Sequence, residues 1–207
     1  MSFQHYNLKN YNTGLFTFGD GYSNNLAYTI GLSRNNTATN PIYPVSGSNF
    51  SLSAKLTIPY SAFNGVDYRG LRAERDDLEE ILIDDVNNVD VRERIAEIDQ
   101  ERFNWLEYYK IKFSGDWYTR LVDKLVLRTR TEFGFLGAYN NDRGIPPFER
   151  FFVGGDGLGA FSLDGREVIQ LRGYPNQSLS DNDGNTIYNK FSLELRYPIT
   201  LKQLASI

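Results

Sequence analysis

Few side chains in this sequence could do chemistry together, and their spacing argues against a catalytic or metal site. The chain has one histidine, His5, and no cysteine. Hydrolase triads need a base beside an activated nucleophile, so the usual ones are nearly excluded. His5 has no metal-ligating side chains at useful spacing. We therefore expect no enzyme activity, no metal and no cofactor.

Two glycine-bearing runs have the composition of ligand loops without the required spacing. GGDGLG at residues 154–159 lacks the G-x-G-x-x-G pattern and the strand-to-helix context of a phosphate loop. DNDGNT at residues 181–186 has its glycine at the fourth position, where a calcium loop needs it at the sixth. Both are expected to be ordinary loops.

The most informative polar motif lies in EVIQLRGYPN, residues 167–176, within a predicted loop of about fifty residues, 137–189. Connections of that length are usually functional or disordered. A compact tip is expected from Leu171, Arg172, Gly173 and Tyr174, because glycine permits a tight turn and arginine offers five donors in a rigid fork. If the tip folds back into the lumen of a barrel, Arg172 needs acceptors or an aromatic face. Glu132 and Glu194 would point into that lumen, because each alternates with apolar residues along its predicted strand. The alternative is a solvent-exposed Arg172 in a mobile loop.

Strands must position these groups, and five segments alternate apolar and polar side chains as strands do. In residues 50–58, Phe50, Leu52, Leu56 and Ile58 share one face and Lys55 lies on the other. The same alternation is found in residues 25–33, 105–117, 125–135 and 191–199. A soluble sheet with a dry core and a membrane barrel with lipid-facing apolar residues both produce this pattern.

Aromatic placement favours the barrel. Trp105 and Trp117 lie twelve residues apart on one predicted strand face, roughly 30 Å of height for a tilted strand. This matches an apolar band flanked by aromatic girdles. Glu107 on the same face is discordant and is expected at or beyond the rim. The opposite faces carry charges of both signs. Their cations Lys55, Arg128, Arg130 and Arg196 are expected to line a lumen and to pair with acidic side chains there rather than to contact a client.

The predicted fold class is therefore all-β, an antiparallel transmembrane β-barrel present as an incomplete set of about six strands. The 207 residues form part of one such domain, and no apolar run approaches the length of a spanning helix. Between Gly70 and Asn104 lie 12 of the 26 acids but only 5 of the 22 bases. The sequence contains no basic patch with interleaved aromatic residues, so nucleic acid is not expected as a partner.

This acidic region, residues 62–104, is predicted to be a helical insertion in an extracellular loop. Asp90 and Glu93 resemble a capping box. Apolar stripes are formed by Leu78, Ile81, Leu82 and Val86, and by Val91, Ile95 and Ile98. The insertion is either a solvated hairpin that decorates the loop or a surface on which a partner docks.

The segments ERFFVGGDG, LRGYPN and FSLELRYPI together resemble the BamA family of outer-membrane-protein assembly factors, whose superfamily includes TamA and the two-partner secretion transporters. PIYPVSGSNFSLSAKLTIPYS, residues 41–61, is similar to the family's strand, short periplasmic turn and next strand. The resemblance implies that Arg172, Gly173 and Tyr174 form a loop tip tucked into the barrel lumen. It covers nearly the whole chain outside the acidic insertion.

The resemblance implies an insertase of the Gram-negative bacterial outer membrane. Such a protein thins or opens the bilayer and templates client strands at its seam without ATP. Its partners would be the lipid bilayer, unfolded outer-membrane proteins and accessory assembly lipoproteins. With no signal peptide, no POTRA domain and no aromatic-terminated final strand recognised, we expect a central part of the barrel that lacks the lateral seam. A two-partner secretion pore and a soluble β-sheet binding protein are the alternatives.

Overall fold

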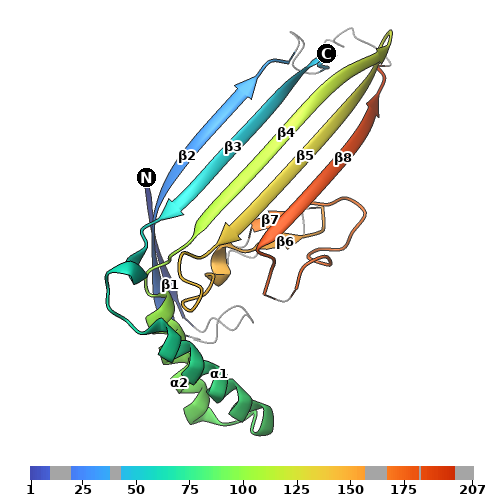
Figure 1. Ribbon diagram of the computed structural model, residues 1–207. Helices are drawn as coiled ribbons and strands as arrows, with labels where there is room; N and C mark the ends of the chain where they lie inside the picture. The colour runs from blue at the N-terminus through green and yellow to red at the C-terminus, as the bar shows by residue number, and fades with distance from the viewer. Residues whose placement is uncertain (10–19, 38–42, 157–166, 182, 199–207) are drawn as a thin grey trace, which may run out of the picture. The chain divides into compact units, whose positions relative to one another are not determined.

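A computed structural model describes residues 1–9, 20–37, 43–156, 167–181 and 183–198. Its main element is a six-stranded sheet in which neighbouring strands run antiparallel, in the order β1-β2-β3-β4-β5-β8 (Figure 1). The strands are β1 (Ser2–Leu8), β2 (Gly21–Asn35), β3 (Gly47–Thr57), β4 (Tyr109–Val122), β5 (Leu125–Gly137) and β8 (Ile187–Arg196). The sheet is open, as expected for an incomplete barrel, and the predicted fold class is confirmed.

Contacts within the chain define two compact units. The first comprises Met1–Thr29, Lys55–Lys110 and Phe135–Ile187, and holds the helices and the long connection after β5. The second comprises Ile30–Ala54, Ile111–Gly134 and Tyr188–Ile207. Its described residues lie mainly in strand segments and the turns between them.

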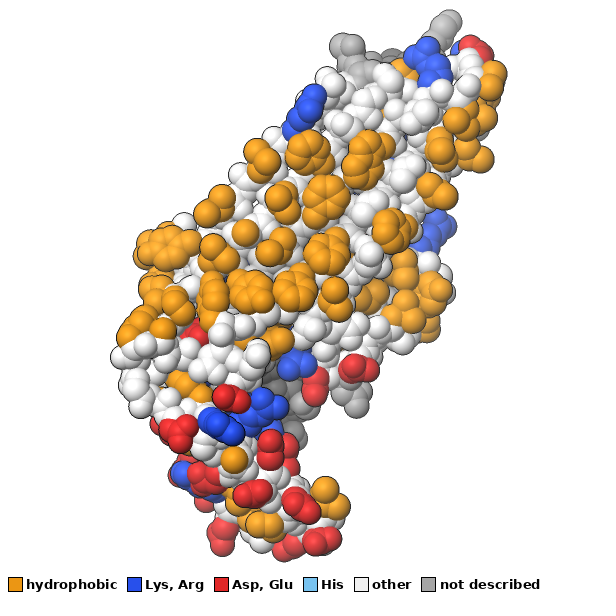
Figure 2. Space-filling model, viewed as in Figure 1, with side chains coloured by type: hydrophobic (Ala, Val, Ile, Leu, Met, Phe, Trp, Pro, Cys, Tyr) orange, Lys and Arg blue, Asp and Glu red, His pale blue; other side chains and the backbone are white. Residues whose placement is uncertain are grey.

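In the second unit the apolar face of the sheet is exposed. Leu52 is 41% exposed and Leu193 is 75% exposed. Other exposed members of this face are Ile30, Leu32, Trp117, Leu121, Phe191 and Leu195, and Figure 2 shows apolar side chains spread over the sheet. A soluble sheet would cover such a surface with a core layer, whereas lipid-facing strands leave it exposed.

Strand boundaries differ from the predicted ones in two places. β4 begins at Tyr109, so Trp105 lies outside it and pairs with Asn24 in an isolated bridge. The two tryptophans therefore do not mark the ends of one strand, although both are exposed. β1 was not predicted, because its sequence SFQHYNL has too little alternation. A short turn at Asp123 and Lys124 joins β4 to β5, with Asp123 at φ 40°.

Two helices occupy the insertion: α1 (Tyr68–Asp84) and α2 (Val89–Phe103). The side chain of Asp67 caps α1 by accepting from the Gly70 amide, and Asn88 caps α2 by accepting from the Val91 amide. The predicted capping box of Asp90 and Glu93 is wrong, because helical geometry already begins at Val89. Neither helix of the described chain is both long and apolar enough to cross a membrane.

The apolar stripes of the insertion are only partly buried. Ile95 and Ile98 of α2 are fully buried, as predicted for one face of an amphipathic helix. On α1, Leu78 and Leu82 are half-buried. Ile81 and Val86 are exposed, which differs from the predicted stripe. They lie near the far end of the hairpin, where α1 passes into α2.

The long connection between β5 and β8 has structure of its own. It contains a 3-10 turn, η2 (Pro147–Glu149), and two short parallel strands, β6 (Phe151–Val153) and β7 (Glu167–Ile169). Phe148, Phe151 and Phe152 are buried. These aromatic side chains fix the first part of the connection within its unit.

Candidate functional site

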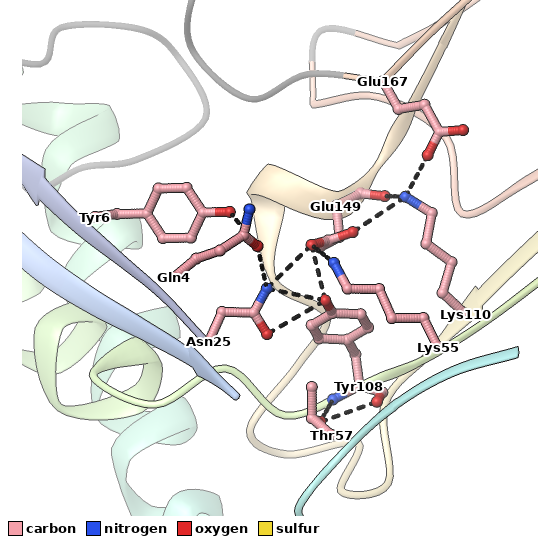
Figure 3. A network of polar contacts seen from close by, with 9 residues as sticks. All are labelled: Gln4, Tyr6, Asn25, Lys55, Thr57, Tyr108, Lys110, Glu149 and Glu167. Atoms are coloured by element: carbon pink, nitrogen blue, oxygen red, sulfur yellow. Dashed lines mark hydrogen bonds and ion pairs between the residues drawn. The ribbon is translucent and has the colours of Figure 1, made fainter. Parts of the chain in front are cut away.

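A buried carboxylate in η2 is the centre of the most elaborate polar site. Glu149 Oε1 lies 2.7 Å from Lys55 Nζ and accepts a hydrogen bond from the Tyr108 hydroxyl at 2.8 Å. The Asn25 amide nitrogen donates to the same oxygen at 3.3 Å. Figure 3 shows these side chains pointing toward Glu149. One loop carboxylate thus gathers groups from three other segments.

Lys110 extends the site to a second part of the loop. Its ammonium donates to the backbone oxygen of Glu149 at 2.8 Å and lies 3.2 Å from Glu149 Oε2. The same nitrogen lies 2.6 Å from Glu167 Oε2 in β7 and 4.6 Å from the centre of the Phe151 ring. We call Lys55, Lys110, Glu149 and Glu167 the charge cluster (Figure 3). Its two positive and two negative charges balance.

The positions of the strand groups follow from alternation. Asn25 lies in β2, Lys55 in β3 and Lys110 in β4, the latter two in polar phase between the apolar residues of their strands. Tyr108, just before β4, is held by Thr57, whose hydroxyl donates to the Tyr108 carbonyl at 3.0 Å and accepts from its amide at 2.7 Å. The strands therefore present preformed donors to the loop.

Electrostatics keep Glu149 ionised. Burial alone would raise the pKa of its carboxyl, but the charges of Lys110 and Lys55 and hydrogen bonds from Lys55 and Tyr108 outweigh it, so the pKa lies below its usual value. Burial, reinforced by the Glu149 charge, raises the pKa of the Tyr108 hydroxyl. Tyr108 therefore stays a neutral donor at any physiological pH.

The charge cluster joins two ammonium groups to two carboxylates and can hold the loop against the strands. Among the described residues, no group of three or more His, Cys, Asp or Glu side chains could hold a metal ion. Removing one member of a buried ion pair costs about 3–5 kcal/mol, because the partner charge stays buried.

Lys55, predicted to face the lumen, belongs to the charge cluster of the first unit. The other three predicted lumen-facing cations, Arg128, Arg130 and Arg196, form a separate set of ion pairs in the second unit. Arg128 lies 2.8 Å from Asp116 and 3.0 Å from Glu194. Glu132 lies 2.7 Å from Arg130 and 3.0 Å from Lys190. Arg196 lies 3.5 Å from Glu194 and stacks on Tyr43. These contacts join side chains of β4, β5 and β8.

The predicted loop tip forms a turn in the first unit. Gly173 has φ 91°, and the Tyr174 amide donates to the Leu171 carbonyl at 3.3 Å. Arg172 and Tyr174 are exposed, and Leu171 is half-buried. Both candidate acceptors for Arg172, Glu132 and Glu194, have other cationic partners. A pairing of Arg172 with either carboxylate stays a prediction.

Sequence reasoning found Lys55 but missed Glu149, Glu167, Tyr108 and Asn25. Glu149 stands beside Arg150 in a loop, where a surface ion pair is the ordinary interpretation. The available signal was the run of aromatic residues after it, Phe151 and Phe152, which marks a segment that must be buried.

An open sheet with one exposed apolar face, and a long loop held to polar strand positions, defines a membrane β-barrel protein. The chain belongs to the Omp85 superfamily, whose domain matches residues 1–206. Among solved structures, it resembles the crystal structure of BamA from Haemophilus ducreyi lacking POTRA domains 1–3. That likeness has a TM-score of 0.52 at 18% identity, and covers 88% of this chain and 27% of that one. No curated protein matches the sequence.

Proposed function

We propose that this chain is part of the barrel of a BamA-like insertase, which assembles outer-membrane β-barrel proteins in the Gram-negative bacterial outer membrane. The observation that carries the proposal is the exposed apolar sheet face together with a long loop held by the charge cluster. The insertion of residues 62–104 would lie on the extracellular side. The superfamily match and the likeness to BamA support this assignment.

The proposed activity uses no chemical catalysis, cofactor or ATP. The barrel would thin the bilayer locally and offer backbone hydrogen bonds to the strands of unfolded clients. Its partners would be the lipid bilayer, the client proteins and accessory assembly lipoproteins. The loop tip at Arg172 would stay in the lumen while the charge cluster holds the base of the loop, so the lumen stays obstructed.

The experiment is client assembly by the intact protein in liposomes. A urea-unfolded outer-membrane protein is added, and its folding is followed by heat-modifiable mobility and protease resistance. We expect faster assembly than in empty liposomes. A lack of acceleration, combined with translocation of a secreted exoprotein into the vesicles, would favour the two-partner secretion pore instead.

Arg172→Ala tests the loop tip within this proposal. We expect weaker client assembly and faster proteolysis of the loop, because the guanidinium fork supplies donors that alanine lacks. Arg69→Ala, which removes another exposed arginine at the start of α1, is the control. Normal assembly with unchanged proteolysis in the Arg172 variant would contradict a role for the tip.

A further inference from the structure

Two buried arginines join the helical insertion to the start of the long loop, and neither belongs to the charge cluster. Arg102 lies in the last turn of α2, and Arg143 lies in the loop after β5. Arg143 is 1% exposed and Arg102 is 8% exposed. Burial of two guanidinium groups is costly unless each has several partners.

The two side chains bind each other's backbone. Arg102 donates from Nε and Nη2 to the Arg143 carbonyl at 3.1 and 2.8 Å. Arg143 Nε donates to the Arg102 carbonyl at 2.7 Å. We call this reciprocal pair the arginine clasp. Because each arginine holds the main chain at the other, the clasp fixes backbone positions on both sides.

Further contacts complete the clasp on the insertion side. Arg143 Nη1 lies 2.9 Å from Glu107 Oε2, and its Nη2 donates to the Trp105 carbonyl. Glu107 in turn accepts from the amide and hydroxyl of Ser61 at 2.7 and 2.6 Å. Both ends of the insertion, near residues 61 and 107, are therefore tied to one guanidinium group. Glu107 lies before β4 and is buried.

The loop side is shaped to receive Arg102. Gly144 has φ 88°, and a Cβ atom there would lie 2.9 Å from Arg102 Nη2. The side chain of Asn140 accepts from the amides of Asp142 and Arg143 at 2.9 and 3.3 Å. This turn comes directly before η2, which carries Glu149.

We propose that the helical insertion is a positioning element of the long loop, with Arg102 and Arg143 as its positioning residues. The clasp sets the first turn of the loop, and the charge cluster then receives Glu149 a few residues later. An effect of the clasp on client assembly rests on the proposed function, in which the loop tip takes part in that assembly. The insertion is then more than a decoration of the loop, whether or not a partner also docks on it.

Arg102→Ala tests the inference, with Arg94→Ala on the same helix as the matched control. The Arg94 guanidinium binds Glu74 and Glu97 within the hairpin. In a background without other cysteines, a single Ile169→Cys at the buried residue of β7 reports exposure of the loop. In the full-length protein in native membranes, we expect about tenfold faster maleimide labelling with Arg102→Ala than with Arg94→Ala. Equal labelling rates would overturn the inference.

Gly144→Ala disturbs the arginine clasp from the loop side and is a second variant for the same labelling experiment. We expect faster labelling from Gly144→Ala by itself, because its Cβ would meet Arg102 Nη2 and the backbone at φ 88° disfavours alanine. Combined with Arg102→Ala, the increase should be smaller than the sum of the two single effects, because both variants disturb the same contact. Additive effects would show two independent losses and overturn the clasp. Heat-modifiable mobility must show a folded barrel in every variant. If Arg102→Ala does not fold, Arg102→Lys, which keeps the charge near Asp99 but loses the fork, is expected to label at an intermediate rate.

Client assembly by the otherwise unchanged protein tests the proposed function separately. If that protein assembles no clients while labelling still depends on Arg102, the proposed function fails and the positioning role stands. If that protein assembles clients normally and the labelling rate does not depend on Arg102, the proposed function stands and the positioning role is refuted.

Discussion

Glu149 shows how one buried side chain can decide where a long loop lies. Its carboxylate faces two ammonium groups and a tyrosine hydroxyl from other segments. If the loop leaves, Lys55 and Lys110 lose the charge that compensates them. The same contacts therefore stabilise the loop and the strand residues beneath it.

Glu149→Gln should loosen the base of the loop. Glutamine keeps the shape but removes the negative charge between Lys55 and Lys110, and we expect local opening to become easier by about 3–5 kcal/mol. Hydrogen exchange at the Phe151 amide, which donates to the Asn185 carbonyl at 2.9 Å, measures this opening. Glu97→Gln, at an exposed hairpin position, should have almost no effect. Equal protection in both variants would argue against the cluster.

The pH dependence of the same contact follows from the sign of the shift. The pKa of Glu149 is lower in the held loop than its ordinary value, which is about 4.3 in a released chain. Its contribution to loop stability is therefore complete above that ordinary value and is lost as pH falls through the lower folded pKa. Maleimide labelling of Ile169→Cys needs the thiolate and is therefore too slow at acidic pH. Hydrogen exchange at the Phe151 amide is the measurement instead.

We expect the protection factor of the Phe151 amide, corrected for the pH dependence of intrinsic exchange, to stay constant from neutral pH to about pH 5. It should fall at more acidic pH. The Glu149→Gln variant should lack this acid transition. Loss of protection already between pH 7 and about pH 5 would show that another group controls the loop.

At the scale of elements, α2 depends on a cap that only its backbone geometry reveals. Asn88 accepts from the Val91 amide at 3.2 Å, and its own backbone is extended. Two residues later Asp90 lies in the first turn, where its charge favours the helix without capping it. Several aspartates and asparagines compete for the cap in this sequence, so composition alone does not choose among them.

Asn88→Ala should destabilise the first turn of α2 by about 1 kcal/mol, because the Val91 amide loses its acceptor. Hydrogen exchange at residues 91–93 is the measurement. Asn87→Ala changes the same residue type one position earlier and should leave that exchange nearly unchanged. A larger effect at Asn87 would place the cap elsewhere.

At the scale of the whole molecule, the exposed apolar face makes a prediction about the surrounding solvent. Leu193 of β8 is exposed, and Ser192 beside it points to the opposite face. In reconstituted full-length protein, a fluorophore on Leu193→Cys should be quenched by lipids with brominated chains. The same label on Ser192→Cys should be quenched much less. Equal quenching at both positions would contradict a lipid-facing sheet surface.

The sequence by itself determined the strands with strong alternation, the helical insertion and the charged polar faces. These features depend on local periodicity, which one strand or helix already contains. Lys55, Arg128, Arg130 and Arg196 could be assigned to polar faces for that reason. β1 cannot be predicted from its sequence, because its alternation of apolar and polar residues is weak. Trp105 is wrongly predicted to lie in a strand, because the alternation continues past the residue at which β4 begins.

Only the tertiary structure decided which charges meet. Glu149 lies 94 positions from Lys55, and Arg143 lies 41 from Arg102, so no local pattern links them. Their contacts depend on how the loop packs against strands and helices formed elsewhere in the chain. That packing decides which charged side chains are buried together. A buried charge without a partner is costly, so the folded chain favours arrangements that pair the buried charges.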